Sequence, residues 1–196
     1  RYWIHNAFID INGEKMSKSM GNVRTVRELL ALFPGEVLRF ALISAHYRSA
    51  LNFSSELLTS ARGTLDTFYG ALRRHLAVEP AALNVTDSRV LLALLDDMNT
   101  PEAIAALHSA ASTLNKSDDP QEIAMAKAEL IMGGRLLGIL DADPEAWFTD
   151  AVGEEGLAAG EIDALIEERT VAKASRNFQR ADQIRDDLEA QGVVLQ

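Results

Sequence analysis

The sequence predicts a mainly α-helical chain that opens with a small α/β segment. Near the N-terminus, an Asn12-Gly13 pair separates two short runs, and this pair is the strongest two-residue signal for a β-hairpin. From Ser54 onward, apolar and small residues recur at spacings of three and four, and short polar breaks separate the periodic stretches. Several antiparallel helices joined by short connections form a bundle, so we expect an antiparallel helical bundle after the α/β segment.

The α/β segment is expected to contain a hairpin and two helices. Residues 7–11 and 14–16 are the two strands of the hairpin. Thr25-Val26-Arg27-Glu28 is a capping box, which predicts a short helix that continues to Leu32. A second helix is expected over 36–45, where the apolar positions are too crowded for an exposed element.

The bundle is expected to contain four helices with identifiable starts. Ser54 is the expected N-cap of the first helix, and Glu79-Pro80 breaks the pattern that follows. Gly133-Gly134 would destabilise the last helix by up to ~1 kcal/mol each relative to Ala unless close packing requires them. The later helices are expected to begin at Thr86 or Asp87, at Thr100-Pro101-Glu102 and at Asp119-Pro120, and to end at Leu95, Leu114 and Leu140.

The end of the chain is expected to form a partial α/β domain. Residues 141–160 are rich in Asp, Glu and Gly, include Pro144 and contain no Lys or Arg, a composition that indicates a linker. Helices are expected over 161–175 and 178–191, followed by a strand at 193–195 whose partner is not in the sequence. The expected divisions are therefore 1–53, 54–140, 141–160 and 161–196, with the last domain incomplete.

Composition limits the possible functions. The net charge is −10, yet residues 1–48 carry seven Lys/Arg against four Asp/Glu, and a second basic group lies near the C-terminus. An acidic chain with two basic zones suits an elongated polyanion contacted at two places. No apolar run reaches the ~18 residues of a membrane span, so we expect a cytoplasmic protein without membrane contact. The absence of cysteine excludes thiolate metal sites, and no metal ligands are proposed in the chain.

The most informative motif is Lys15-Met16-Ser17-Lys18-Ser19, which lies between Gly13 and Gly21. It resembles the KMSKS signature of class I aminoacyl-tRNA synthetases. The flanking sequences Tyr2-Trp3-Ile4-His5, Met20-Gly21-Asn22 and His46-Tyr47-Arg48-Ser49 narrow the resemblance to the cysteinyl-tRNA synthetases.

The resemblance implies ATP-dependent ligation of L-cysteine to tRNA(Cys) through a cysteinyl-adenylate. Lys15, Met16, Ser17, Lys18 and Ser19 would then bind ATP, with Mg²⁺ sharing the phosphate charge. Lys18 is the expected catalytic residue. Catalysis of this reaction depends mainly on a positive charge placed beside the oxygens of the departing pyrophosphate, and a lysine ammonium supplies that charge.

Three further groups of residues belong to the resemblance. His46-Tyr47-Arg48-Ser49 resembles the tRNA stem-contact region, although a His-Tyr-Arg turn can also be a structural corner. Asp96-Asp97-Met98-Asn99-Thr100-Pro101-Glu102-Ala103 resembles the head of a bundle helix in these enzymes. Its paired carboxylates could suggest a metal or general acid/base site, but capping by Asp97 at a helix end and by Thr100 at a helix start is the expected role. The region from 161 resembles the start of an anticodon-binding domain, and its basic residues would form a stripe if the region were nearly one helix. Its tentative tRNA-binding residues, together with Arg48, are Arg169, Lys173, Arg176, Arg180, Asp182 and Arg185.

The sequence lacks two parts of the family pattern, the HIGH motif and the zinc ligands that select cysteine. We therefore expect a portion of a longer enzyme, monomeric and inactive by itself, whose zinc would bind elsewhere in the parent. Two alternatives remain open: the cysteine ligase of mycothiol synthesis, and a non-catalytic tRNA-binding helical module.

Overall fold

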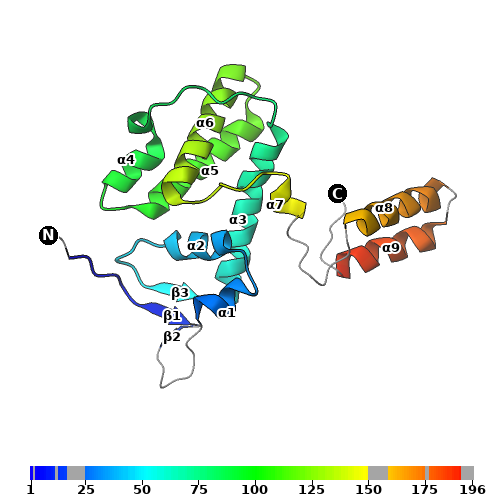
Figure 1. Cartoon of the computed structure of the whole chain (residues 1–196), viewed down its shortest axis with the longest axis horizontal. Helices are drawn as coiled ribbons and strands as arrows, with labels where there is room; N and C mark the ends of the chain where they lie inside the picture. Colours follow the sequence, from blue (N-terminus) through cyan, green and yellow to red (C-terminus); the bar gives the residue numbers. More distant parts are fainter. Residues whose placement is uncertain (2, 12, 17–24, 150–158, 175–176, 191–196) are drawn as a thin grey trace. The chain divides into compact units, whose positions relative to one another are not determined.

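The computed structural model describes residues 1, 3–11, 13–16, 25–149, 159–174 and 177–190. The chain divides into two compact units, Arg1–Pro144 and Glu145–Gln196. The described part is mainly helical with one small sheet, which confirms the predicted fold class (Figure 1). The predicted strand at 193–195 lies outside the described residues.

The first unit begins with a three-stranded sheet in the order β2-β1-β3. The predicted hairpin is confirmed: β1 (Ile9–Ile11) pairs antiparallel with β2 (Glu14–Lys15). Strand β3 (Leu51–Phe53) pairs in parallel with β1, and Ile9 lies opposite Leu51. The sequence did not predict β3, because three residues are too few for an alternating pattern and the partner strand is about forty residues away.

Two short helices separate β1 and β2 from β3. Helix α1 (Val26–Leu30) begins with the predicted capping box, in which the Glu28 N–H donates to the Thr25 hydroxyl and the Thr25 N–H donates to the Glu28 carboxylate. Helix α2 (Gly35–Ile43) is buried along its apolar face, as its crowded apolar residues predicted.

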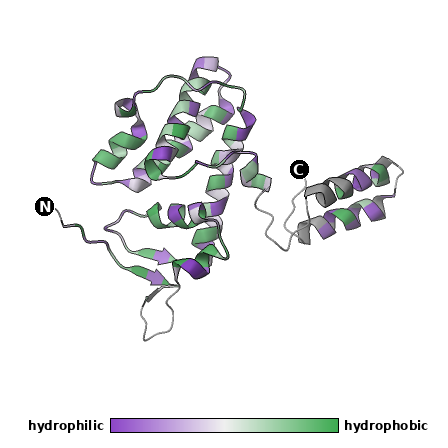
Figure 2. Cartoon of the chain, in the orientation of Figure 1, coloured by the Kyte–Doolittle hydropathy of each residue, from purple (hydrophilic) through white to green (hydrophobic). Residues whose placement is uncertain are grey.

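The bundle consists of α3 (Ser55–Arg74), α4 (Arg89–Leu95), α5 (Thr100–Lys116) and α6 (Pro120–Leu137), with a 3-10 turn, η2 (Val85–Asp87), before α4. Hydrophobic and hydrophilic positions alternate around these helices (Figure 2). The fully buried side chains at its centre include Leu65, Phe68, Tyr69, Leu107 and Leu114. The aromatic ring of Phe68 packs edge-on against Phe40 of α2, with ring centroids 6.3 Å apart, and this contact joins the bundle to the α/β segment.

Some helix starts agree with the sequence and others differ. Ser54 caps α3 and Asp119 caps α6, as predicted. Helix α4 is capped by Ser88, not by Thr86 or Asp87, because those two residues form η2. The buried Glu129 carboxylate accepts hydrogen bonds from the Ser88 hydroxyl at 3.0 Å and the Val90 N–H at 3.1 Å, and thereby holds this helix start.

Helix α6 packs closely and ends earlier than the predicted Leu140. A Cβ atom added at Gly133 would lie 2.5 Å from Val90 Cγ2 and 2.7 Å from Leu107 Cδ2. The adjacent glycines are therefore present because neighbouring residues leave no room for a side chain. The helix ends at Leu137 because Gly138 adopts a left-handed conformation, with φ of 68°.

The turn after α6 is tied to α2 through a buried tyrosine. The Tyr69 hydroxyl donates to the Glu36 carboxylate at 2.8 Å and accepts from the Ala142 N–H at 3.2 Å. The same carboxylate accepts from the Leu140 N–H at 2.7 Å. Burial, followed by the Glu36 hydrogen bond, raises the pKa of the Tyr69 hydroxyl above its ordinary value.

The second unit contains α7 (Ala146–Thr149), α8 (Ala159–Ala174) and α9 (Phe178–Ala190). Helices α8 and α9 lie side by side and run in opposite directions (Figure 1). Ala181 and Ile184 of α9 and Ala172 of α8 are buried. The predicted break near Asn177 is confirmed by the end of α8 at Ala174 and the start of α9 at Phe178.

Candidate functional site

The hairpin carries the beginning of the predicted phosphate-binding segment. Lys15 ends β2, where its backbone lies opposite Asp10. The Met16 N–H then donates to the Ile9 carbonyl at 3.4 Å, so the antiparallel pairing continues one residue further. Ser17, Lys18 and Ser19 lie outside the described residues. The structure therefore shows where the chain enters this segment, at the end of β2.

The predicted stem-contact residues His46, Tyr47, Arg48 and Ser49 follow helix α2, and we call them the polar corner. The Tyr47 carbonyl accepts a hydrogen bond from the Ala7 N–H at 2.8 Å, which fixes the corner to the chain just before β1. The Leu51 N–H donates to the Phe8 carbonyl at 3.1 Å, so the chain leaving the corner enters the same sheet. The corner is thus part of the framework that carries the hairpin.

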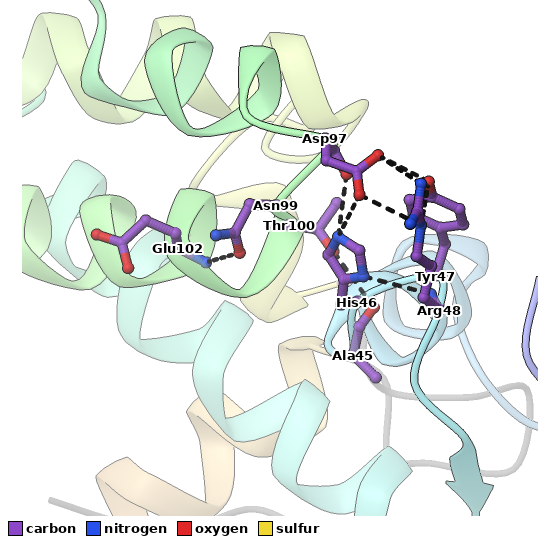
Figure 3. A network of polar contacts seen from close by, with 8 residues as sticks. All are labelled: Ala45, His46, Tyr47, Arg48, Asp97, Asn99, Thr100 and Glu102. Carbon is purple, nitrogen blue, oxygen red and sulfur yellow. Dashed lines mark hydrogen bonds and ion pairs between the residues drawn. The ribbon is translucent and has the colours of Figure 1, made fainter.

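The corner is joined to the turn between α4 and α5 by three consecutive side chains (Figure 3). The Tyr47 hydroxyl donates to the Asp97 carboxylate at 2.7 Å, and Arg48 Nε lies 2.7 Å from the Tyr47 oxygen. Arg48 Nε also lies 3.2 Å from the second Asp97 oxygen. The residues around 46–49 and those around 96–103, far apart in the sequence, therefore form one cluster.

His46 supports the same cluster in a defined tautomer. The Arg48 backbone N–H donates to His46 Nδ1 at 3.3 Å, so this nitrogen acts as the acceptor. The other ring nitrogen, Nε2, then carries the proton and donates to the Asp97 backbone carbonyl at 3.0 Å. The His46 and Tyr47 rings lie with their centroids 4.7 Å apart. The histidine thus holds the backbone of Asp97, while Tyr47 and Arg48 hold its carboxylate.

Arg48 remains available to an external anion despite these contacts. Its side chain is 65% exposed. The hydrogen bond with Tyr47, followed by the charge of Asp97, raises the pKa of Arg48 above its ordinary value, so the guanidinium stays charged. Tyr47 and Asp97 orient the guanidinium from one side, so its other side would lose less conformational entropy on contact with an anion.

The α4–α5 turn corrects the capping role predicted for Asp97 and Thr100. Asp96 is the C-cap of α4, and Asn99 is the N-cap of α5, where its side chain accepts from the Glu102 N–H at 3.2 Å. Asp97 and Met98 have φ values of 52° and 53°, a left-handed conformation that non-glycine residues rarely adopt. Thr100 is already helical, and its hydroxyl donates to the Ala45 carbonyl at 3.3 Å. The prediction was wrong because the side chains of Asp97 and Thr100 contact Tyr47 and Ala45 and do not cap a helix.

The basic residues near the C-terminus are divided between two helices. Arg169 and Lys173 belong to α8, whereas Arg180, Asp182 and Arg185 belong to α9. The single stripe expected for a nearly continuous helix does not form, because the chain reverses direction between these helices. Arg176 lies outside the described residues.

Several of these charges have partners within the unit. Arg180 Nε donates to Glu168 Oε1 at 2.9 Å, a contact between α9 and α8, and this hydrogen bond raises the pKa of Arg180. Arg185 lies 3.2 Å from Asp182 one turn away. Lys173 is exposed. Among the described residues, Arg169 Nε is a buried donor without an acceptor.

In the ranges that the structure describes, no group of three or more His, Asp or Glu side chains is arranged to hold a metal ion. Among the same residues, no helix combines the length and apolarity needed to span a bilayer.

Comparison with known proteins gives matches over both parts of the first unit. Residues 1–63 match the family model described as tRNA synthetases class I (C) catalytic domain, and residues 89–141 match the model of the DALR domain. The first match covers the hairpin and the polar corner, and the second covers α4 to α6.

Curated relatives match along the whole chain. A cysteine–tRNA ligase of Saccharophagus degradans is 50% identical over 197 residues, which cover 100% of this chain and 43% of the relative. Cysteine–tRNA ligases of Caulobacter vibrioides and Rhodospirillum rubrum are 45% and 44% identical and cover 99% and 100% of the chain, with 42% and 43% of their own lengths matched. The chain therefore spans less than half the length of these relatives.

Proposed function

We propose that the chain belongs to the cysteinyl-tRNA synthetase family and forms part of an enzyme that ligates L-cysteine to tRNA(Cys) with ATP. The observation that carries this proposal is the alignment of the entire chain with cysteine–tRNA ligases at 44–50% identity. The hairpin ending at Lys15 supports it, because this hairpin delivers the lysine- and serine-rich segment from a defined position.

In the proposed activation step, the cysteine carboxylate attacks the α-phosphorus of ATP. A new oxygen–phosphorus bond forms as the bond to pyrophosphate breaks, which gives cysteinyl-adenylate. Lys15, Met16, Ser17, Lys18 and Ser19 form the ATP-binding segment, and Lys18 stabilises the negative charge that develops on the departing pyrophosphate. Mg²⁺ accompanies ATP as part of the substrate complex. In the transfer step, a hydroxyl of the terminal tRNA ribose attacks the carbonyl carbon of the adenylate, so an ester bond to cysteine forms as the bond to the phosphate breaks and AMP leaves.

The proposed tRNA contacts lie at two places in the sequence. Arg48 is supported by its exposure and by the side chains that orient it. In the second unit, we propose tRNA contact for Arg169, Lys173, Arg176, Arg180, Asp182 and Arg185. The exposed side chain of Lys173 supports this choice among the described residues.

The remaining assignments follow from the same family. We propose a cytoplasmic monomer, with the domain divisions 1–53, 54–140, 141–160 and 161–196. The sequence has no cysteine, and the described residues gather no metal-binding group, so they do not fit the zinc site expected for the family. No step is therefore assigned to zinc in this chain.

The test is Lys18→Ala in the complete protein that carries this chain, with Lys116→Ala at the end of α5 as the matched control. ATP–pyrophosphate exchange with cysteine should fall by about 100-fold or more, because a lost transition-state contact of this kind has effects of that size. Affinity for tRNA should remain close to that of the wild type. Unchanged exchange with Lys18→Ala would refute the proposed role, whereas exchange without any transfer to tRNA would favour a different acceptor, such as an amino sugar.

A further inference from the structure

The turn of the hairpin is held by a side chain from the third strand. Asn52, in the middle of β3, accepts a hydrogen bond through Oδ1 from the Gly13 N–H at 3.0 Å. Gly13 has φ of 81°, a conformation suited to glycine at a tight turn. The contact joins two residues that are 39 positions apart in the sequence.

This contact supplies a restraint that the hairpin itself lacks. Strand β2 consists of Glu14 and Lys15 only, and the next backbone hydrogen bond, from Met16 to Ile9, is long at 3.4 Å. Strand β2 lies at the edge of the sheet and pairs with β1, and a two-stranded pairing of this length is marginally stable by itself in water. A hydrogen bond at the turn therefore contributes substantially to the direction in which the chain leaves Lys15.

Asn52 is itself fixed to the rigid part of the first unit. It lies opposite Asp10 in the parallel pairing of β3 with β1. The next residue, Phe53, is buried, and Ser54 then caps α3 with its hydroxyl accepting from the Leu57 N–H at 3.3 Å. The acceptor that holds the turn is thus anchored directly to the first helix of the bundle.

We propose that Asn52 is a positioning residue for the ATP-binding segment. By holding the Gly13 N–H, it sets the place and direction in which Lys15 enters that segment, without touching the nucleotide. This inference rests on the proposed function of Lys15 and the residues after it. Asn52 is exposed, so its effect should appear in ATP chemistry more than in global stability.

The experiment uses two nearly isosteric substitutions in the complete protein. Asn52→Leu removes the acceptor, whereas Asn52→Asp keeps an oxygen at the same position. Asn84→Leu, at an exposed asparagine before η2, is the control. For each variant, kcat and KM for ATP are measured in ATP–pyrophosphate exchange, together with the melting temperature, tRNA affinity and hydrogen exchange of the Gly13 amide.

The expected result for Asn52→Leu is faster exchange of the Gly13 amide and a roughly three- to tenfold lower kcat/KM for ATP, the size expected from losing one hydrogen bond. Its tRNA affinity and melting temperature should match those of the control. Asn52→Asp should recover most of the loss. Its recovery will be incomplete if repulsion from Asp10 opposes it.

Three outcomes would overturn the inference. If Asn52→Leu lowers ATP chemistry no more than Asn84→Leu does, while Lys18→Ala abolishes it, Asn52 has no positioning role and the proposed function stands. If Asn52→Asp shows the same loss as Asn52→Leu, the acceptor atom is not responsible. If neither Lys18→Ala nor Asn52→Leu affects exchange, the proposed function fails, and this inference fails with it.

Discussion

The Tyr47 hydroxyl and the Asp97 carboxylate, fifty residues apart, meet at 2.7 Å and join the polar corner to the turn between α4 and α5. Asp97 also lies 3.2 Å from Arg48, so a single carboxylate holds both residues. The backbone of Asp97 is left-handed, which places the side chain toward the corner at some cost in strain.

Asp97→Asn should weaken this junction while keeping a residue type that tolerates a left-handed backbone. The expected loss is roughly 0.2–1 kcal/mol in the free energy of unfolding, because the pair is partly exposed. Urea unfolding measures it. Asp96→Asn, which removes the neighbouring carboxylate at the C-cap of α4, is the control and should have a smaller effect. Equal effects of the two substitutions would contradict a specific role for Asp97.

Arg48→Ala should weaken tRNA binding if the exposed guanidinium contacts a phosphate. The slope of log affinity against log salt should become shallower by about one, because one fewer counterion is released. Binding is measured at several salt concentrations, and Lys116→Ala is the control. A salt slope identical to that of the wild type would limit Arg48 to its structural contacts with Tyr47 and Asp97.

Gly133→Ala should destabilise the bundle, because the new methyl group would approach Val90 and Leu107 too closely. A loss of about 1–3 kcal/mol in the free energy of unfolding is expected from such overpacking. Gly63→Ala provides a matched control within α3, since a Cβ there meets nothing within 4 Å. That control should stabilise the protein by up to ~1 kcal/mol through helix propensity. The prediction fails if both substitutions change stability in the same direction.

Lys127→Met should destabilise the turn that follows α3. The buried Lys127 ammonium donates to the carbonyls of His75, Leu76 and Val78 at 2.9, 3.3 and 2.6 Å. Methionine keeps much of the side-chain volume but removes all three donors, so we expect a loss of about 1–3 kcal/mol or more in the free energy of unfolding. Chemical denaturation gives the value. Lys116→Met should be nearly neutral because Lys116 is exposed, and a similarly small change at Lys127 would show that water replaces its contacts.

The buried Tyr69 predicts a loss of stability at alkaline pH. Burial and the Glu36 hydrogen bond raise the pKa of Tyr69 in the folded protein. The unfolded chain therefore releases its tyrosine proton first, above pH ~10, and the free energy of unfolding falls as pH rises further. The slope from this group should approach ~1.4 kcal/mol per pH unit.

Urea unfolding between pH 8 and pH 11 tests this expectation with the wild type and Tyr69→Phe. The variant should be less stable at pH 8, because Glu36 and Ala142 lose their partner. The difference between the two proteins should then shrink as pH rises above 10. A difference that stays constant across this range would show that Tyr69 does not titrate differently in the folded and unfolded states.

Features that depend on neighbouring residues could be predicted from the sequence. The Asn12-Gly13 signal located the hairpin, the Thr25–Glu28 capping box located α1, and Asp119-Pro120 located the start of α6. These signals work because turns and helix starts are stabilised by hydrogen bonds that span only two to four residues. The family is likewise indicated by a contiguous stretch, the lysine- and serine-rich motif with its flanking residues.

Features that depend on distant residues became visible in the folded chain. Strand β3 forms by parallel pairing with β1. Ser88 caps α4 because Thr86 and Asp87 lie in η2 and because the Glu129 carboxylate holds the Ser88 hydroxyl. The pairing of Asp97 with Tyr47, and of Asn52 with Gly13, leaves no periodicity or local motif in the sequence. Such contacts form when packed helices and strands bring polar groups within hydrogen-bond distance, so the local sequence supplies the donors and acceptors while the fold selects their partners.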